Sequence, residues 1–178
     1  MALPWNTLLA DQLDWHWRHQ LRGRLAGLTD DEYFWQPVPD CWTVHPGPDG
    51  RLTIDWAYPP PDPAPVTTIA WRLNHILVGV LAMRSARHFG GPPADYATYA
   101  YPATAAEALD RLDGEVERWL TGVRGLDEEA LERPCGEEGP YAQEPMAALV
   151  LHINREMLHH GAEISLLRDV YAHRPLRN

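Results

Sequence analysis

A chain of 178 residues, 45% of them hydrophobic and 22% charged, has the size and composition of one soluble globular domain. Its formal net charge of −10 argues against a nucleic-acid backbone as a partner. We therefore expect a single domain over residues 1–178 that binds no nucleic acid.

Three features indicate a cytoplasmic protein without membrane contact. The N-terminal stretch MALPWNTLLADQLDW lacks a basic region followed by an apolar run, so it is not expected to be a signal peptide. No apolar run approaches the length that spans a bilayer. Cys41 and Cys135 lie far apart and form no CxxC motif, so nothing indicates a disulfide framework or a four-thiolate zinc site.

The first part of the chain predicts one long helix and one short helix. Residues 5–28 carry leucines and a tryptophan at three- and four-residue steps, and Gly27 closes this pattern. Thr29 followed by three acidic residues predicts a short helix over TDDEYFWQ, which Pro37 ends. Residues 36–65 are too rich in Pro and Gly for a helix, and RLTIDW within them predicts a brief extended segment. We expect this loop to be an ordered flap over one end of the fold.

The remainder predicts three further long helices. Thr67 or Thr68 caps the second, which Gly90-Gly91-Pro92 ends, and Thr104 with Glu107 forms a capping box for the third. After a short helical turn from Asp127 and an irregular loop over 134–145, the last helix runs to about residue 173. The pattern as a whole predicts an all-α fold, an up-down-type four-helix bundle with two long irregular loops.

The last helix carries an unusual concentration of His and Glu. At about 100° per residue, Glu156 and His160 fall on the arc that faces the core, whereas His152, His159 and Glu163 lie along its border. Burying a carboxylate and an imidazole one turn apart is costly unless something compensates them, and a metal ion would do so. Such a pair, four residues apart on one helix, offers two ligands to one ion.

A third candidate ligand lies on another helix. His75 stands at the edge of the apolar stripe of the second helix, and metal sites in bundles are built from inward side chains of facing helices. For each of these residues taken alone, a purely structural role remains an alternative. His75 could be a satisfied core histidine, and Glu156 could be paired with Arg72 or with a group next to Arg155 instead of a metal.

The segments WRLNHILVG and LHINREMLHHGAEISLLRD resemble the DinB-like superfamily (DinB/YfiT), which includes thiol-dependent S-transferases and the mycothiol-dependent maleylpyruvate isomerase. The resemblance implies one divalent metal ion, commonly zinc or nickel, held by three side chains and water. His75, Glu156 and His160 match the three ligand positions, in the His, Glu, His order of the isomerase branch. The resemblance also implies a homodimer, which is the common state of small cytoplasmic bundles.

A second alignment to the same family remains open. Many members carry His-x-x-x-His followed by Arg-Gly-Gln, and placing Gly161 on that Gly puts Arg155 where a His ligand is expected. His159 would then be a ligand, with His152 as an alternative one. We prefer Glu156 and His160, because the helical wheel turns that pair toward the core, and we expect His152 and His159 to line the pocket.

These ligands suggest a function. Two imidazoles and one carboxylate suit Zn²⁺ with an open position, which can hold a thiol as a nucleophilic thiolate. The chain's own cysteines lie in or next to the loops, so the thiol would be a low-molecular-weight cofactor. Mycothiol is one candidate, because a chain whose basic residues are all Arg suggests a GC-rich source.

The leading hypothesis is therefore a metal-dependent enzyme that transfers a thiol to a small electrophile or isomerises one. Arg72, Arg155 or His159 would assist substrate binding or proton transfer. Two alternatives are a non-catalytic metal- or ligand-binding bundle in stress response and a metal-dependent hydrolase.

Overall fold

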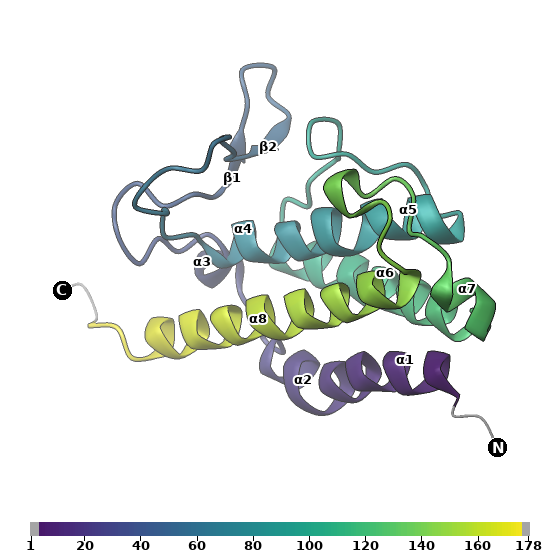
Figure 1. The fold of residues 1–178 in the computed structure, drawn as a ribbon. Coiled ribbons are helices and arrows are strands. Elements are labelled where there is room, and N and C mark those ends of the chain that lie inside the picture. Colours follow the sequence, from purple (N-terminus) through teal and green to yellow (C-terminus); the bar gives the residue numbers. More distant parts are fainter. Residues whose placement is uncertain (1–3, 176–178) are drawn as a thin grey trace.

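The computed structural model describes residues 4–175, and this part of the chain is mostly helical, as the all-α prediction requires (Figure 1). Residues 1–3 and 176–178 of the expected domain lie outside the described range. The elements, in chain order, are α1 (Trp5–His16), η1 (Trp17–Leu21), α2 (Arg22–Arg24), α3 (Asp30–Tyr33), β1 (Val44–Pro46), β2 (Leu52–Ile54), α4 (Ile69–Asn74), η2 (His75–Ala82), α5 (Met83–Phe89), α6 (Ala105–Arg124), α7 (Glu128–Glu132), η3 (Gly139–Tyr141) and α8 (Met146–Ala172).

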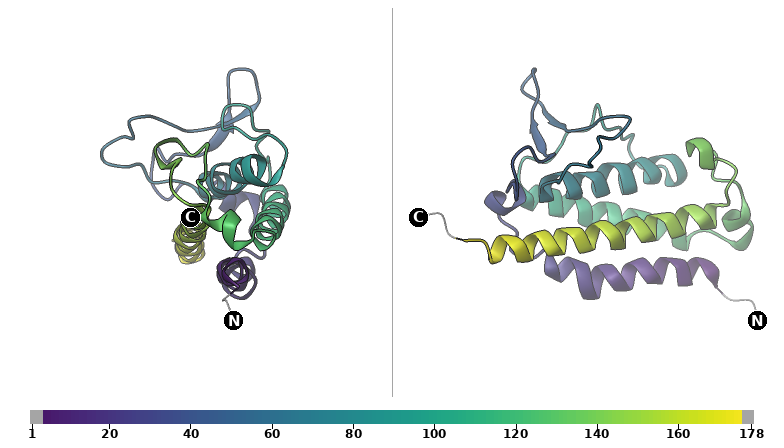
Figure 2. Two further views of the ribbon diagram at one scale, coloured as in Figure 1. Left: turned by 45° about the vertical axis from the view of Figure 1, so that its right-hand side comes forward. Right: turned by 60° about the vertical axis from the view of Figure 1, so that its left-hand side comes forward.

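Four long helical segments lie side by side (Figures 1 and 2). The first joins α1, η1 and α2, the second joins α4, η2 and α5, and α6 and α8 form the third and fourth. All four contribute fully buried side chains to one apolar core, among them Leu13, Leu77, Trp119 and Ile153. None of the described helices has the length and apolarity needed to cross a membrane.

The directions of the segments follow from contacts between residues far apart in sequence. Asn6 donates a hydrogen bond to the carbonyl of Arg124 at 2.7 Å, and Arg22 pairs with Asp113 at 2.8 Å, so the first segment and α6 are antiparallel. Likewise Arg72, near the start of α4, pairs with a residue in the second half of α8, so those helices are antiparallel too.

The second and third segments run in the same direction. At one end of these segments, the short helix α3 contacts both α4 and α6. At the other end, the ring centroids of Phe89 in α5 and Trp119 in α6 are 5.2 Å apart. The strict alternation of an up-down bundle therefore holds from the first segment to the second and from the third to the fourth, but not between the second and third. The reason is the loop over 90–104, which is long enough to lead the chain back along the helices before α6 begins.

The helix boundaries follow the local chemistry that the sequence indicated. The side chains of Thr68, Thr104 and Asp127 each accept a hydrogen bond from a backbone N–H three residues on, as N-caps do. Gly90 ends α5 with a φ of 72°, in the left-handed region that favours glycine. Pro145 precedes the first turn of α8 as its N-cap.

The first long loop is ordered and packs on the start of the second segment. Its strands β1 and β2 pair antiparallel with Val44 opposite Ile54; RLTIDW was predicted to be extended, whereas β1 was not predicted. Trp71 donates its indole N–H to the carbonyl of Asp55 at 2.9 Å, and its ring lies 5.9 Å from that of Trp42. These contacts hold the flap over the end of the helices where α4 begins (Figure 1).

Candidate metal centre

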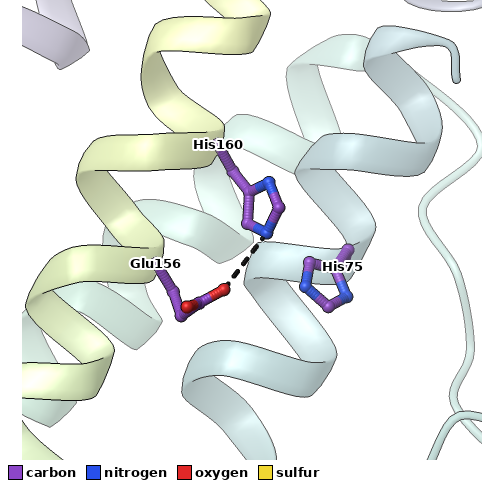
Figure 3. A group of neighbouring side chains, drawn as sticks. All are labelled: His75, Glu156 and His160. Carbon is purple, nitrogen blue, oxygen red and sulfur yellow. Dashed lines mark ion pairs between the residues drawn. The ribbon is translucent and has the colours of Figure 1, made fainter. Parts of the chain in front are cut away.

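His75, Glu156 and His160 meet between the second segment and α8 (Figure 3). His75 is the first residue of η2, where the helix changes from α to π geometry, and such π segments are frequent at functional sites. Glu156 and His160 lie one turn apart on α8, on the side that faces His75. His160 is buried, and the other two residues are partly buried.

The spacing of these three side chains suits a metal ion. Each offers one ligand atom, and these atoms all lie within 4.8 Å of one another. The Oε2 atom of Glu156 is 3.4 Å from Nε2 of His160, as the dashed line in Figure 3 marks. Zinc ligands at about 2.0–2.1 Å in tetrahedral geometry lie about 3.3 Å apart, so small side-chain movements would bring the three atoms to that spacing.

The protonation state of His75 also suits a ligand. Burial, together with the neighbouring His160, Arg72 and Arg84, lowers the pKa of His75 to about 3. The imidazole is therefore neutral near pH 7, with one ring nitrogen free to donate a lone pair to a metal.

The Nδ1 atom of His160, on the side of the ring away from Glu156, contacts a second carboxylate. Nδ1 of His160 lies 2.7 Å from Oε2 of Glu163 and 3.3 Å from a guanidinium nitrogen of Arg72, which pairs with the same oxygen at 2.9 Å. A carboxylate only accepts and a guanidinium only donates, so the shorter contact assigns the proton to Nδ1, which donates to Glu163. A carboxylate behind a ligating histidine fixes the tautomer and makes the imidazole a better ligand, so Nε2 of His160 is left as the lone pair beside Glu156. Because Arg72 pairs with Glu163, the alternative that Arg72 neutralises Glu156 does not hold.

The carboxylate of Glu156 is free to accept a hydrogen bond or bind a cation. Within residues 4–175 its oxygens have no hydrogen-bond partner, and the nearest Arg or His nitrogens, on His152, Arg155 and His160, are 3.4 to 3.6 Å away. Those distances exceed a normal charge-assisted hydrogen bond of about 2.7–2.9 Å. The nearest guanidinium, on the largely exposed Arg155, is 3.6 Å away, so this partly buried carboxylate can accept a closer cation.

Tyr96 contacts the far side of His75 and was missed by the sequence reasoning. Its hydroxyl lies 2.7 Å from Nδ1 of His75, and the Trp71 ring stacks on the imidazole with centroids 5.2 Å apart. The residue stands in the Tyr-rich loop before α6, where no periodicity or spacing marks it out. With Nδ1 engaged by Tyr96, Nε2 is the nitrogen of His75 available to a metal.

A second group of possible ligands consists of His159, His160 and Glu163 on α8 alone. It suits a metal less well, because the 2.7 Å contact between His160 and Glu163 is a hydrogen bond and Arg72 already pairs with Glu163. The side chain of His159 is 62% exposed and contacts Glu163 at 3.4 Å. This geometry favours the set with His75, in line with the preferred alignment.

The candidate assisting residues are separated by the structure. Arg72 pairs with Glu163, which in turn contacts His160, and the His159 side chain is largely exposed to solvent. Arg155 donates to Nδ1 of His152 at 2.7 Å, and both line a cavity of about 580 Å³ between α5, α8 and the second long loop. Charged, thiol and apolar side chains complete the wall, including Arg84, Cys135, Glu138, Tyr141 and Leu149. Since His152 also contacts Glu156 at 3.5 Å, the cavity adjoins the candidate ligands.

Fold and site together define an all-α protein with a cluster of two histidines and a glutamate between its helices. The family model of the DinB superfamily matches residues 12–164, which include all three candidate ligands. The chain therefore belongs to the DinB superfamily, and the resemblance first noted on two helices is confirmed over most of its length. The match is to the superfamily as a whole and names no branch. No curated protein and no solved structure matches the chain.

Proposed function

We propose that this protein is a metal-dependent enzyme that uses a low-molecular-weight thiol, with mycothiol as one candidate, to attack or isomerise a small electrophile. His75, Glu156 and His160 would hold one divalent ion, zinc or nickel. The proposal treats the four helical segments as a four-helix bundle that presents these ligands from facing helices.

One observation carries this proposal: a carboxylate without a close donor lies between two imidazoles, one of which is neutral through its low pKa and the other backed by Glu163. This set fits a divalent ion by charge, by atom type and by spacing. A bound ion with an open position would supply the Lewis acidity that keeps a thiol deprotonated near pH 7. The chain's own groups would then bind and orient the reactants.

The adjoining cavity supports catalysis over a purely structural metal. Its volume of about 580 Å³ is in the usual range for small-molecule sites. Arg155, which hydrogen-bonds His152, would orient an anionic or carbonyl group of a substrate in this cavity. His152 has a lowered pKa, chiefly because of burial, so the neutral imidazole would hold Arg155 in place by accepting its hydrogen bond at Nδ1.

The thiol would have to come from outside the chain. Cys41 is buried and donates its S–H to the carbonyl of Val38. Cys135 lines the cavity, but its S–H donates to the carbonyl of Glu144 at 2.9 Å, and burial raises its pKa. A thiol held in its protonated form is a poor nucleophile, so neither residue suits the attacking role.

The test is a thiol-dependent activity screen of zinc- and nickel-loaded protein. Cysteine, glutathione, coenzyme A and mycothiol are each combined with a panel of electrophiles, including a chlorinated aromatic, an epoxide and a cis-enone acid. We expect at least one electrophile to be consumed in a reaction that requires both metal and thiol, and we expect Glu156→Ala to abolish that reaction. Turnover of esters or amides without any thiol would replace the proposal with hydrolysis, and inactivity of metal-loaded protein throughout the panel would contradict it.

We also propose that the protein forms a homodimer. Neighbouring helices α1 and α8 expose several large apolar side chains, which a dimer interface would remove from water: Trp5, Leu8, Trp15, Leu151, Leu158 and Leu166. Sedimentation velocity at micromolar concentration should show a dimer that Leu158→Glu dissociates. The control Val38→Glu changes an equally exposed residue (both are 44% exposed) in the first loop and should remain dimeric. A monomeric wild-type protein would contradict the proposal.

A further inference from the structure

The hydroxyl of Tyr96 is placed on His75 by contacts from several elements. The tyrosine stands in the loop between α5 and α6, and its Oη lies 2.7 Å from Nδ1 of His75. Tyr101 donates its own hydroxyl to the Tyr96 carbonyl at 2.7 Å, which fixes the backbone. The ring of Trp56, from the other long loop, stacks on the Tyr96 ring at 5.7 Å. The loops over 36–65 and 90–104 thus meet at Tyr96, next to the candidate ligand.

Gly79 makes the space that this arrangement needs. It lies one turn after His75 in η2, and a Cβ at this position would stand 1.8 Å from the Tyr96 hydroxyl oxygen and 2.6 Å from the ring carbon that bears it. Any larger residue would therefore force the tyrosine away from His75. The φ of Gly79 is not in the left-handed region, so close approach is the structural reason for glycine here.

The hydrogen bond has a direction once Nε2 of His75 is a metal ligand. A neutral imidazole carries one N–H, and a ligating Nε2 cannot hold it. The proton must then be on Nδ1, which donates to the oxygen of Tyr96. The same contact stops the ring from rotating to present Nδ1 instead.

We propose that Tyr96 is a positioning residue that sets the tautomer and the ring orientation of His75, with Gly79 as the space that admits it. This inference rests on the metal site proposed above. It makes the two histidines unequal, because His160 is backed by the carboxylate of Glu163 and His75 by a neutral hydroxyl. A carboxylate raises the basicity of a ligating imidazole more than a phenol does, so His75 depends on Tyr96 mainly for geometry.

The experiment compares Zn²⁺ affinities, measured by competition with a chromophoric chelator, for the wild-type protein and three variants. Tyr96→Phe keeps the ring and its stacking but removes the acceptor, and we expect its Kd to rise about 10- to 100-fold. Gly79→Ala should raise the Kd in the same direction by displacing the hydroxyl. Tyr58→Phe removes a hydroxyl from an 87% exposed side chain and should bind zinc like the wild type.

A second readout follows the imidazole itself. In ¹H–¹⁵N correlation spectra of zinc-loaded protein, His75 should show a protonated Nδ1 and a ligated Nε2, and Tyr96→Phe should lose or mix this pattern. Circular dichroism checks that each variant is folded. If the wild type binds zinc and Tyr96→Phe binds it equally tightly with an unchanged His75 spectrum, the role of Tyr96 is wrong while the metal site stands. A folded wild-type protein that binds no zinc overturns both.

Discussion

Two glutamates with histidine neighbours, Glu138 and Glu156, show how differently the same residue types can be used. Both lie at the wall of the same cavity or next to it, and both approach an imidazole nitrogen. They differ in how many close donors each carboxylate receives. That difference separates a group that stabilises the fold from one that is available to bind a cation.

Glu138 is fully satisfied. Its oxygens lie 3.1 Å from Nε2 of His88, 3.1 Å from Arg84 and 3.3 Å from Arg87, all on α5. Burial alone would raise the pKa of Glu138, but the hydrogen bond from His88 and the two guanidinium charges lower it to about 2. The carboxylate thereby holds the 134–145 loop against α5, and two guanidinium groups already compensate its charge.

Glu156 has the opposite surroundings. Its neighbours are imidazoles and one largely exposed arginine, and their nitrogens are 3.4 to 3.6 Å away, longer than a charge-assisted hydrogen bond of about 2.7–2.9 Å. A carboxylate with three close donors is already compensated, whereas one whose nearest guanidinium is 3.6 Å away can accept a closer cation. The comparison predicts that replacing Glu156 weakens metal binding with little effect on stability. Replacing Glu138 should lower the stability with little effect on metal binding.

The largest effect should be on metal affinity. Glu156→Ala removes one of three protein ligands, and we expect the Kd for Zn²⁺ to rise more than about 100-fold, beyond the effect of losing a group behind a ligand. Glu138→Gln should leave the Kd within about threefold of the wild type, a free-energy change under ~0.7 kcal/mol. Isothermal titration with zinc measures both. Comparable losses of zinc affinity in the two variants would contradict the distinction between Glu138 and Glu156.

A smaller effect is expected on the free energy of unfolding. Glu138→Gln removes the charge from the hydrogen bonds with Arg87 and His88 and from the ion pair with Arg84, and we expect a loss of about 1–3 kcal/mol at pH 7 in urea denaturation. Because the folded pKa is lowered to about 2, the contribution of Glu138 is present above its unfolded pKa of about 4.3 and is lost as the pH falls toward 2. The difference between wild type and Glu138→Gln should therefore shrink between pH 5 and pH 2. A difference that stays constant over this range would contradict the role of the charge.

The smallest effect should appear when Glu156 is tested without metal. In the presence of a chelator, Glu156→Gln removes a charge that has no close partner, so the free energy of unfolding should change by no more than about 0.5 kcal/mol. Urea denaturation of both proteins in chelator measures this directly. A destabilisation above about 2 kcal/mol would show that Glu156 is a structural ion-pair residue like Glu138.

Local chemistry explains what the sequence could predict. Thr68, Thr104 and Asp127 cap helices by bonds to N–H groups three residues on, and Gly90 ends one through a left-handed φ. Each signal involves only neighbouring residues, so it can be recognised in sequence. The convergence of His75 with the pair on α8 was predictable for a similar reason, because helical periodicity shows which side of each helix faces inward.

Contacts between distant segments explain what was missed. Tyr96 reaches His75 because Gly79 leaves room and Trp56 stacks on it, and no periodic pattern links these residues. The π geometry of η2 and the parallel course of the second and third segments depend likewise on packing over long separations. The clamp on Glu138 joins a loop to a helix about 50 residues earlier, as the 3.1 Å contact with His88 shows.

The most direct test of the metal site compares His160→Ala with His159→Ala in one zinc titration, with the wild type beside them. The two residues are adjacent in sequence, but the His160 side chain is 9% exposed and faces Glu156, whereas that of His159 is 62% exposed. We predict close to one zinc ion per chain in the wild type and in His159→Ala, and loss of most of it in His160→Ala. Zinc retained by His160→Ala and lost from His159→Ala would contradict the site and favour the alternative alignment.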